Sequence, residues 1–528
     1  ATAWKLSAQG TPNKVDDKYS ADDKLLSFFT RANYNFEDKY LLSFTFRADA
    51  SSKFSSNNRW GYFPSAAAAW RISSEKFMSG TKKWLDDLKL RLSFGTAGNN
   101  NIPVGQLSQM YEAMTGSATG WVNGFTTMWA PSKEMANPDL KWETTITRNV
   151  GLDFTLWNGK LTGTLDAYLN TTKDLLIKFP VSGTGYDSQY RNMGKTENKG
   201  LEASLTWHAV NKQNWGIDLT GNIGINKGKI KSLGSMNEFG AETRWASSEI
   251  GEEYRIIVGG QVGEIYGYKS AGRYEVSDFQ GYDQTSSKWI LKEGVADASA
   301  VIGDVRPGSM KLVDQATVEN EDGTKSGNGV IGEEDKVKIG NVNPDVTGGF
   351  ALNARAYGFD LAANFNFSIG NQVYNANKIE CTQTGKYQYR NMITEMADGK
   401  RWTNLNEDGT LCNDPEKLAE LNKNTTMWSP YTSKMILTDW AIEKASFLRL
   451  NTLTLGYTLP QSITKRVGIN SLRFYATAYN VFTITNYSGF DPESDCIKKS
   501  GQESLTPSCD YSGYPRSRSF VFGVNLNF

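Results

Sequence analysis

The chain ends with Phe520-Val-Phe-Gly-Val-Asn-Leu-Asn-Phe528. Successive side chains of a β-strand point to opposite faces. One face of this segment therefore carries Phe520, Phe522, Val524, Leu526 and Phe528, and the other carries Val521, Gly523, Asn525 and Asn527. The last residues of a soluble domain usually fray into solvent, whereas a strand with one apolar face suits a wall between lipid and an aqueous lumen. The segment predicts the closing strand of a transmembrane β-barrel.

The composition excludes several other classes of protein. The 57 basic residues balance the 57 acidic ones, so there is no charge excess that would favour nucleic acid. Mean hydropathy is −0.49, and no run of eighteen apolar residues could form a membrane helix. Barrel strands keep this average low because only every second residue meets lipid. The single histidine, His208, is interpreted as a wall residue, since one histidine makes a multi-histidine metal site or a Ser/His relay unlikely.

Two-residue periodicity recurs along most of the chain. It is clear in 161–169, 359–369 and 472–479, where apolar residues alternate with polar or small ones. Strands of a soluble β-sandwich also alternate, but they are commonly about five or six residues long. Several segments here keep the alternation for ten residues or more, as tilted membrane strands must. The fold class is therefore predicted to be all-β, an antiparallel transmembrane barrel.

Connections between the expected strands come in two sizes. The short ones are 34–39, Asn158-Gly159-Lys160, 211–213 and Tyr357-Gly358, and the Asn-Gly pair is typical of a type I′ hairpin turn. The long polar ones are 98–140, 173–198, 229–343, 371–443 and 485–516. Short turns on one side and long loops on the other are the pattern of outer-membrane barrels, whose long loops face outside the cell.

The number of strands leads to a prediction about the chain as a whole. Strands are expected at 22–34, 39–50, 62–73, 88–97, 142–157, 160–172, 199–210, 214–228, 344–357, 359–370, 444–458, 471–484 and 517–528. The last strand must run from the outside to the periplasm, because the long 485–516 loop precedes it. Counting back over an odd number of strands, the first also starts outside. Single-chain bacterial barrels normally have even strand numbers, so we expect the C-terminal part of a larger barrel, cut in a surface loop.

Several segments together resemble the SusC/RagA-like family of TonB-dependent transporters. They are Tyr40-Leu-Leu-Ser-Phe-Thr-Phe-Arg-Ala-Asp-Ala-Ser-Ser-Lys-Phe54, Asn57-Asn-Arg-Trp-Gly-Tyr-Phe-Pro-Ser65 with Trp70, Asn137-Pro-Asp-Leu-Lys-Trp-Glu143 with Asn149-Val-Gly-Leu-Asp-Phe154, Asn198-Lys-Gly-Leu-Glu202, Ile339-Gly-Asn-Val-Asn-Pro344 with Gly348-Gly-Phe350, Phe447-Leu-Arg-Leu-Asn-Thr-Leu-Thr-Leu-Gly-Tyr457, Leu472-Arg-Phe-Tyr475, Asn480-Val-Phe482, Gly489-Phe-Asp-Pro-Glu493, Tyr514-Pro515 and the terminal Phe528. These segments span nearly the whole chain in the family's order.

The resemblance implies a 22-stranded barrel in the bacterial outer membrane, with an N-terminal plug domain and a TonB-contacting segment. It also implies a SusD-like surface lipoprotein that acts as a lid over the extracellular mouth. Residues 1–528 would then be the C-terminal part of the barrel, and about nine strands would lie in an N-terminal remainder together with the plug and the TonB box. A terminal aromatic such as Phe528 resembles the signal that the outer-membrane assembly machinery reads.

A calcium-loop-like stretch often precedes the Gly-Asn-Pro-Asn-Pro region of this family. Aligning Gly329 with position 6 of an EF-type loop places Asn328 at position 5 and Asp335 at position 12. Thr324 and Ser326 then occupy positions 1 and 3, so two strong oxygen ligands are lost. A solvated turn is the favoured reading, and calcium at Asn328 and Asp335 is the minor one. No other cofactor is expected.

Four cysteines fall in two predicted outer loops, with Cys381 and Cys412 in one and Cys496 and Cys509 in the other. An even number in an oxidising compartment allows three pairings. The pairing that closes each loop on itself is favoured, Cys381–Cys412 with Cys496–Cys509, and free thiols are the alternative.

Aromatic residues are frequent in the long loops, and aromatic faces in a solvated cavity can stack on sugar rings or peptide side chains. The candidates for contact with substrate or partner are Trp121, Trp129, Tyr186, Tyr190, Trp245, Trp402, Trp428 and Tyr431. For any one of them, packing of loop against loop or against the lid is the stronger alternative. By parity Tyr168, Tyr475 and Tyr479 point inward, where they would line the lumen or pack against the plug.

The sequence therefore predicts TonB-dependent import of a nutrient, an oligosaccharide or otherwise an oligopeptide, captured between the outer loops and the lid lipoprotein. No constellation for covalent chemistry is found, so an enzyme is not expected. The alternative is a structural or adhesive barrel whose loops bind partner proteins without transport. A plug and a TonB box encoded upstream would argue against that alternative.

Overall fold

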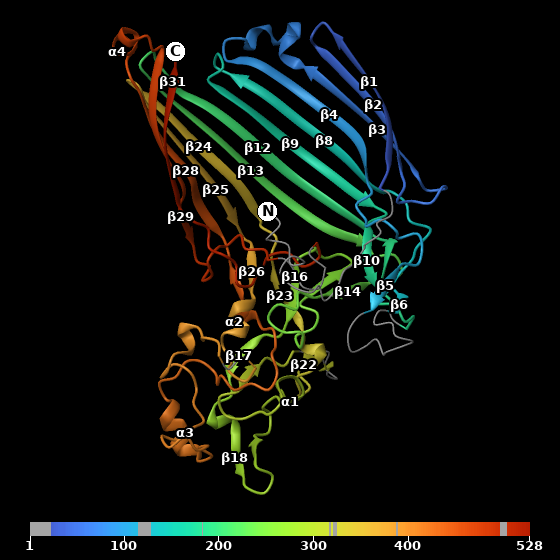
Figure 1. Cartoon of the computed structure of the whole chain (residues 1–528), viewed down its shortest axis with the longest axis vertical. Helices are drawn as coiled ribbons and strands as arrows, with labels where there is room; N and C mark the ends of the chain where they lie inside the picture. The colour runs from blue at the N-terminus through green and yellow to red at the C-terminus, as the bar shows by residue number, and fades with distance from the viewer. Residues whose placement is uncertain are drawn as a thin grey trace. The chain divides into compact units, whose positions relative to one another are not determined.

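One large sheet organises the chain. The computed structural model describes residues 23–114, 128–181, 183–315, 318–319, 325–386, 389–496 and 504–528. Within them, thirteen long strands hydrogen-bond to one another in the order of the sequence (Figure 1). They are β1 (Leu25–Phe36), β2 (Tyr40–Ser51), β3 (Trp60–Arg71), β4 (Leu85–Asn99), β8 (Glu143–Leu156), β9 (Leu161–Lys173), β12 (Lys195–Asn211), β13 (Trp215–Ser232), β24 (Val346–Ala356), β25 (Phe359–Ile369), β28 (Phe447–Thr458), β29 (Ser471–Thr485) and β31 (Ser519–Asn527). Each of the thirteen predicted strands is confirmed.

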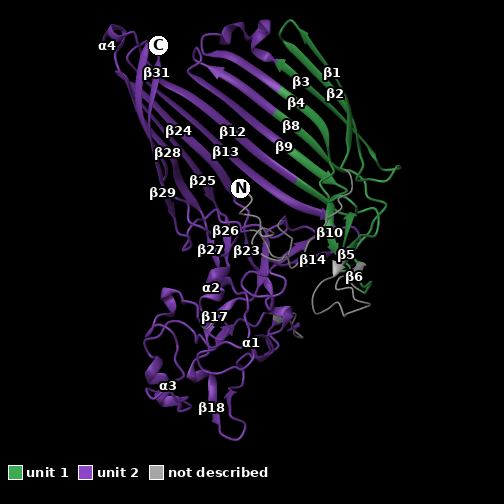
Figure 2. Cartoon of the chain, in the orientation of Figure 1, with its two compact units in different colours: residues 1–70, 91–150, 169–197 green, residues 71–90, 151–168, 198–528 purple. Residues whose placement is uncertain are grey.

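The chain divides into two compact units (Figure 2). Unit 1 consists of residues 1–70, 91–150 and 169–197, and unit 2 of residues 71–90, 151–168 and 198–528. The core of unit 1 is a small cluster of buried Phe54, Phe63, Ile102, Leu140 and Trp142. Unit 2 holds the last six strands of the large sheet and most of the long connections.

Strand register in unit 2 gathers apolar side chains on one face of the sheet. Ala356, Phe359, Tyr457, Phe474 and Val524 face one another across five successive strands. The rings of Phe359 and Tyr457 lie 4.4 Å apart. Most of these side chains are exposed, and Phe522 on β31 is 80% exposed. An exposed apolar face of this extent suits lipid, as the alternation in the terminal segment predicts.

The opposite face of the same strands is polar and tightly packed. The Arg473 guanidinium on β29 donates to Asp360 on β25, across the one intervening strand β28, at 2.9 and 2.5 Å. The ring of Tyr475 lies over Gly523, where an added Cβ would come within 2.3 Å of Tyr475 Cζ. Glycine is therefore required at this point because a neighbouring ring occupies the space of its side chain.

Tight turns close the hairpins at one end of the strands. Tyr357 (φ 50°) and Gly358 (φ 93°) join the paired residues Ala356 and Phe359, the geometry of a type I′ turn, whose twist matches that of the strands. The predicted turn at Asn158-Gly159 is also present, and the left-handed backbone there begins one residue earlier, at Trp157.

At the other end, several long connections fold into structures of their own. In unit 1 they contain β5 (Tyr111–Met114), β6 (Met128–Pro131), β7 (Glu134–Met135), β10 (Leu176–Pro180) and β11 (Ser188–Asn192). In unit 2 they contain β14 (Glu238–Ala241), β15 (Tyr254–Ile257), β16 (Glu264–Gly267), β17 (Ser270–Arg273), β18 (Phe279–Asp283), β19 (Lys288–Leu291), α1 (Ser299–Ile302), β20 (Met310–Leu312), β21 (Val318–Glu319), β22 (Lys325–Ser326), β23 (Val337–Asn341), β26 (Gln372–Asn375), α2 (Ala376–Glu380), α3 (Pro415–Asn422), β27 (Ile442–Lys444) and β30 (Cys509–Asp510). The short helix α4 (Gln461–Thr464) lies instead in the connection between β28 and β29.

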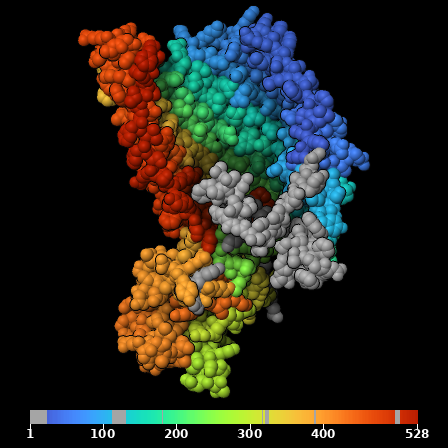
Figure 3. Space-filling model, in the orientation of Figure 1, coloured from blue at the N-terminus to red at the C-terminus, as the bar shows by residue number. Residues whose placement is uncertain are grey.

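We call the described residues of 233–345, 370–446 and 486–518 the loop cluster. Figure 3 shows its segments packed against one another below the strands of unit 2. Its interior is apolar, like that of a soluble domain. One group of buried side chains is Tyr268, Tyr274, Phe279, Ala298, Ile302, Val305, Leu312 and Ile331, and another is Trp402, Cys412 and Leu418. Among the described residues, no helix has the length and apolar character needed to cross a membrane.

Candidate substrate-binding loop cluster

A buried ion-pair network fixes the loop cluster to the sheet. Arg449, the third residue of β28, is buried and donates to Asp491 at 2.7 Å and also to Glu493. Arg516 reaches the same two carboxylates from the other end of the 486–518 connection. Because two arginines share two acids, each buried charge is compensated. The network therefore holds both ends of this connection next to the end of a strand.

A buried carboxyl group, that of Glu253, lies within the loop cluster. Glu253 accepts hydrogen bonds from the Thr243 backbone N–H at 2.5 Å and from the Thr243 hydroxyl at 2.7 Å. Burial raises the pKa of Glu253 to about 7, although the bonds from Thr243 oppose the shift. Burial also raises the pKa of Tyr374, with the nearby Glu253 adding to the effect. The carboxyl group of Glu253 therefore changes its protonation state near neutral pH.

Two of the aromatic candidates belong to the interior of the cluster. Trp402 is only 2% exposed, and its indole nitrogen donates to Asn404 at 2.7 Å. The Arg273 guanidinium covers its ring at 4.5 Å. Trp428 is also buried, edge-on to Trp440 at 4.8 Å. For Trp402 the structure supports loop packing, the stronger alternative from the sequence, because no face of the ring is open to a ligand.

The other aromatic candidates differ in accessibility. Tyr431 is 67% exposed, and Trp245 stacks on Tyr511 at 4.7 Å. In unit 1, Tyr186 is half-buried and Tyr190 packs against the Phe54 cluster. Trp121 lies outside the described residues, and of Trp129 only the backbone, in β6, is described. Contact of these side chains with substrate stays a prediction.

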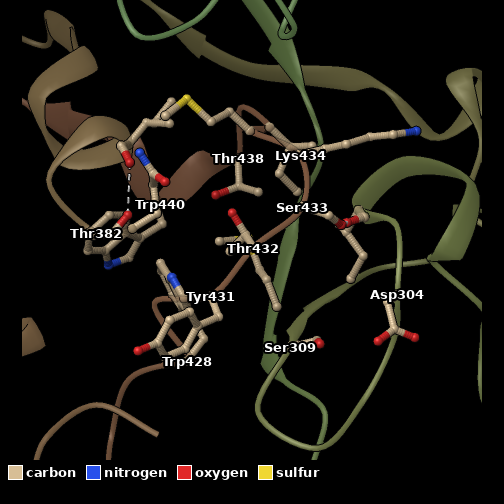
Figure 4. Close-up of a pocket in the computed structure, with 16 residues that line it drawn as sticks. Asp304, Ser309, Thr382, Trp428, Tyr431, Thr432, Ser433, Lys434, Thr438 and Trp440 are labelled. Atoms are coloured by element: carbon tan, nitrogen blue, oxygen red, sulfur yellow. Dashed lines mark hydrogen bonds between the residues drawn. The ribbon is translucent and has the colours of Figure 1, made fainter. Parts of the chain in front are cut away.

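Trp428, Tyr431 and Trp440 line one pocket of the loop cluster (Figure 4). Its walls come from α1, from the start of β20, from the residues after α2 and from the segment 428–440. Figure 4 shows Thr432, Ser433 and Thr438 in the middle of the site, with Trp428 and Tyr431 on one side and Ser309 and Asp304 on the other. The pocket therefore combines aromatic rings with hydroxyl groups.

The three tyrosines expected to face the lumen lie on the polar face of the sheet. Tyr475 covers Gly523, and Tyr479 lies opposite Thr452 and Ser519 in the register. Tyr168 covers Gly200, and its hydroxyl lies 3.3 Å from Asn226 Oδ1. These neighbours place the three tyrosines on the polar side of their strands, and their exposure to a lumen and contact with a passing substrate stay predictions.

His208 is a wall residue in β12, as expected from the sequence. Its Nδ1 lies 2.5 Å from Asp218 Oδ1 on β13. The pair joins two neighbouring strands, and this contact accounts for the histidine without a catalytic role.

The residues proposed for calcium serve the backbone of their loop. Asp335 is buried and accepts from the backbone N–H groups of Gln315 at 2.7 Å and Gly332 at 2.8 Å. Asn328 accepts from the Val330 backbone at 2.8 Å. Within the described ranges, no group of three or more His, Cys, Asp or Glu side chains could hold a metal ion. These contacts favour the turn over the ion, and calcium stays a prediction.

The disulfide prediction needs correction, because all four cysteines are described and no disulfide joins any two of them. Cys412 is buried with Trp402 and Leu418, whereas Cys381 follows α2 and is half-buried. Cys496 and Cys509 are backbone neighbours, with N–H to carbonyl at 2.9 Å, but the Cys496 sulfur contacts the backbone of Tyr511 at 3.1 and 3.3 Å. The absence of both disulfides is the alternative that the sequence left open.

Sequence reasoning did not assign roles to Arg449, at the start of β28, or to Gln383, in the loop cluster. Arg449, Asp491 and Glu493 all stand in segments that carry the family resemblance, so the opposite charges in these segments could have pointed to an ion pair. Gln383 had no such signal, because a single glutamine in a long polar loop resembles any other.

Comparison with known proteins places these observations in a family. Residues 4–297 match the family model described as TonB dependent receptor-like, beta-barrel. The chain is 29% identical over 522 residues to TonB-dependent receptor P3 of Formosa agariphila, covering 98% of this chain and 47% of that protein. It is 30% identical over 518 residues to TonB-dependent receptor SusC of Bacteroides thetaiotaomicron, covering 97% and 44%.

Solved structures give the same result. The structure of the RagAB peptide transporter aligns with a TM-score of 0.75 at 26% identity, covering 100% of this chain and 50% of that chain. The RagAB peptide importer in its "closed-closed" state aligns with a TM-score of 0.74. The chain spans about half the length of the curated relatives it matches.

Proposed function

The chain belongs to the TonB dependent receptor-like β-barrel family, and on this premise we propose that the protein imports a nutrient across the outer membrane with energy delivered by TonB. Its resemblance to SusC and RagA is confirmed, and it is a bacterial outer-membrane protein. The import itself, its cargo and its partners are parts of the proposal.

The observation that carries the proposal is the architecture of the sheet together with its loops. Thirteen strands follow one another in sequence order, and those of unit 2 have one apolar exposed face and one polar face. The RagAB structure aligns over the whole chain with the same fold. In this proposal the polar face lines the route of the cargo, and the loop cluster meets the cargo first.

The partners follow from the same resemblance. We propose a SusD-like lipoprotein that covers the loop cluster as a lid, and an N-terminal remainder that supplies the other strands, the plug and the TonB box. β1 and β31 are the edge strands of the sheet, and their outer edges could pair with such strands. No covalent chemistry is needed for this function, and we propose none.

The cargo is proposed to be an oligosaccharide, or otherwise an oligopeptide. The RagAB structure is named a peptide transporter, whereas the pocket of this chain with Trp428, Tyr431 and Trp440 offers rings and hydroxyls that also suit a sugar. Aromatic rings can contact either cargo.

Uptake tests the proposal. The whole gene is deleted, and the strain is grown on single polymers, glycans and peptides in turn. We expect growth to be lost on one polymer only and restored by the intact gene, but not by a gene whose TonB box is deleted. Unchanged growth on every polymer, together with lost adhesion to a partner protein, would favour a structural or adhesive barrel instead.

A further inference from the structure

The tight-turn end of the sheet in unit 2 carries a row of exposed aromatic side chains. Trp84 stands directly before β4, and Trp157 directly after β8. The Trp157 backbone N–H donates to the Trp84 carbonyl at 2.9 Å, so the two residues are neighbours at adjacent strand ends. Trp215, the first residue of β13, and Tyr357, in the turn after β24, are exposed at the same end. Exposed aromatic residues along one end of a membrane barrel mark the level of the lipid headgroups.

Two connections at this end are longer than a tight turn. One is 72–84, between β3 and β4, and the other is 459–470, between β28 and β29 (Figure 1). The first contains the short 3-10 helices η3 (Ile72–Ser74) and η4 (Lys76–Thr81) and ends at Trp84. The second contains α4 and two cations but no aromatic residue. Of the two, the 72–84 connection is therefore the one that joins cations to the aromatic row.

Three lysines of the 72–84 connection, Lys76, Lys82 and Lys83, are exposed. No ion pair among the described residues involves any of them. The connection contains one acid, Glu75, which is half-buried. Three positive charges against one negative charge leave this segment with an excess of positive charge at neutral pH.

The acids at the start of β4 are held by other groups. Asp87 lies 3.2 Å from Arg71 Nε and accepts from the Ser73 hydroxyl at 2.7 Å. Asp86 accepts from the Gly159 backbone N–H at 3.0 Å. These contacts tie the beginning of the connection and the neighbouring turn to the end of β4. Within the described part of the chain, the two acids therefore do not neutralise the lysines.

The rings of the connection continue the apolar side of β4. Trp84 has the same parity as Leu88 and Leu90, the apolar residues of the first half of the strand. Phe77 is 69% exposed and follows Lys76 in η4. A ring that enters the edge of the hydrocarbon, next to a lysine whose long stem reaches the phosphates, is typical of segments that lie in a membrane interface.

We propose that the 72–84 connection binds an anionic phospholipid in the periplasmic leaflet of the outer membrane. Tight turns of outer-membrane barrels face the periplasm, so this end meets the leaflet that is built of phospholipid. Trp84 and Phe77 enter the leaflet at the headgroup level, and the three lysines pair with lipid phosphates. An anionic headgroup is favoured over a zwitterionic one because the segment carries excess positive charge. The site rests on the outer-membrane location of the protein and not on the proposed import.

Lipid binding is measured on the complete transporter, purified in detergent with the chains that accompany it. Phosphatidylglycerol and phosphatidylcholine with identical acyl chains are titrated separately, and native mass spectrometry gives the affinity of the tightest-bound lipid. We expect phosphatidylglycerol to bind at least about tenfold more tightly, since each lysine at an anionic surface strengthens binding about fivefold. The triple variant Lys76→Gln, Lys82→Gln and Lys83→Gln should lose this preference, and arginine at the same three positions should keep it.

The matched control removes the same amount of charge at the other end of the strands. It replaces three exposed lysines of the loop cluster, in the triple variant Lys288→Gln, Lys400→Gln and Lys417→Gln. This variant should keep the preference for phosphatidylglycerol. Phe77→Ser should weaken the binding of both lipids by a similar factor, about fivefold, because the ring does not distinguish the headgroups.

Hydrogen exchange in lipid nanodiscs locates the contact. In the wild type, the amides of 72–84 should exchange more slowly in phosphatidylglycerol than in phosphatidylcholine, and the glutamine variant should show no difference. The inference is overturned if the wild type does not distinguish the two lipids, if the preference survives loss of the three lysines, or if the loop-cluster control loses it as well. Competition by glycerol 3-phosphate, which has the phosphate without acyl chains, would assign the lysines to a soluble anion and also overturn it. None of these outcomes depends on growth of the deletion strain, so the proposed function is tested separately.

Discussion

The sheet and the loop cluster of unit 2 use the same kinds of side chain in opposite ways. On β31, Phe522 projects from the sheet and is largely exposed, whereas Trp402 in the loop cluster is enclosed and its polar atom is satisfied. Charges differ as well, since Arg449 is buried where the two regions join and Arg306 stays on the cluster surface. Each region is therefore folded for its own solvent, lipid for the outer face of the sheet and water for the loops.

The junction between the two regions should be the most sensitive place. Arg449→Ala leaves Asp491 and Glu493 with fewer positive partners in a buried site, and we expect a loss of about 3–5 kcal/mol of stability. Limited proteolysis of the 486–518 connection, together with thermal unfolding, measures the effect. Arg306→Ala removes an exposed ion pair and should cost less than about 1 kcal/mol. Equal losses in the two variants would show that the junction has no special role.

The two faces of β31 should respond differently to a charge. Phe522→Lys places an ammonium on the apolar face and should cost about 2–4 kcal/mol of folding free energy in a bilayer. Asn525→Lys, on the polar face of the same strand, should cost less than about 1 kcal/mol. Folding into lipid vesicles, followed by heat-modifiable migration of the folded barrel, measures both. The assignment of lipid to the Phe522 face fails if the two lysines behave alike.

Glu253 should make the stability of the loop cluster depend on pH. The folded pKa of Glu253 is about 7, above its ordinary value of 4.5, so the folded state binds the proton more tightly. This stabilisation is complete below about pH 4.5 and is lost as pH rises through 7, by about 3 kcal/mol. Glu253→Gln, which mimics the protonated form, should flatten the profile of loop-cluster stability measured by hydrogen exchange between pH 5 and 8. A wild-type profile that rises with pH in this window and is unchanged in Glu253→Gln would contradict the assignment.

The smallest effect on stability is expected at Gly523, where the Tyr475 ring occupies the space that a side chain would fill. An alanine at Gly523 would bring its Cβ into the Tyr475 ring, so Gly523→Ala should cost about 1–3 kcal/mol. Removing the ring in the double variant with Tyr475→Ala should recover most of that cost. Urea unfolding from lipid vesicles gives the coupling energy of the two sites. Additive losses would mean that the ring and the glycine do not compete for space.

How far the sequence predicts the structure differs between the same two regions. The strands could be predicted because lipid on one side and water on the other impose a period of two. The expected 359–370 and 471–484 correspond to β25 and β29 almost residue for residue. The tight turns could be predicted from residues such as Gly358, whose backbone adopts the left-handed conformation. The sense of each face also followed, because parity places Tyr475 and Phe474 on opposite sides.

The loop cluster was less accessible to prediction, because its burial depends on contacts between residues far apart in the chain. Trp402 and Tyr431 are both aromatic residues of one long connection, and nothing local shows that the first is enclosed and the second exposed. The disulfide prediction failed for the same reason, since loop membership does not bring two sulfurs together. One element did have a local signal, since Asp414-Pro415 is a typical helix start, and Asp414 caps α3 by accepting from the Lys417 backbone.

The four-charge network around Arg449 has a mechanical consequence. Asp491 and Glu493, near the start of the last long connection, and Arg516, near its end, meet at the third residue of β28. A force on that connection is therefore transmitted to β28 through the ion pairs around Arg449. A protein that pulls on the surface of the loop cluster would be pulling on the strand itself.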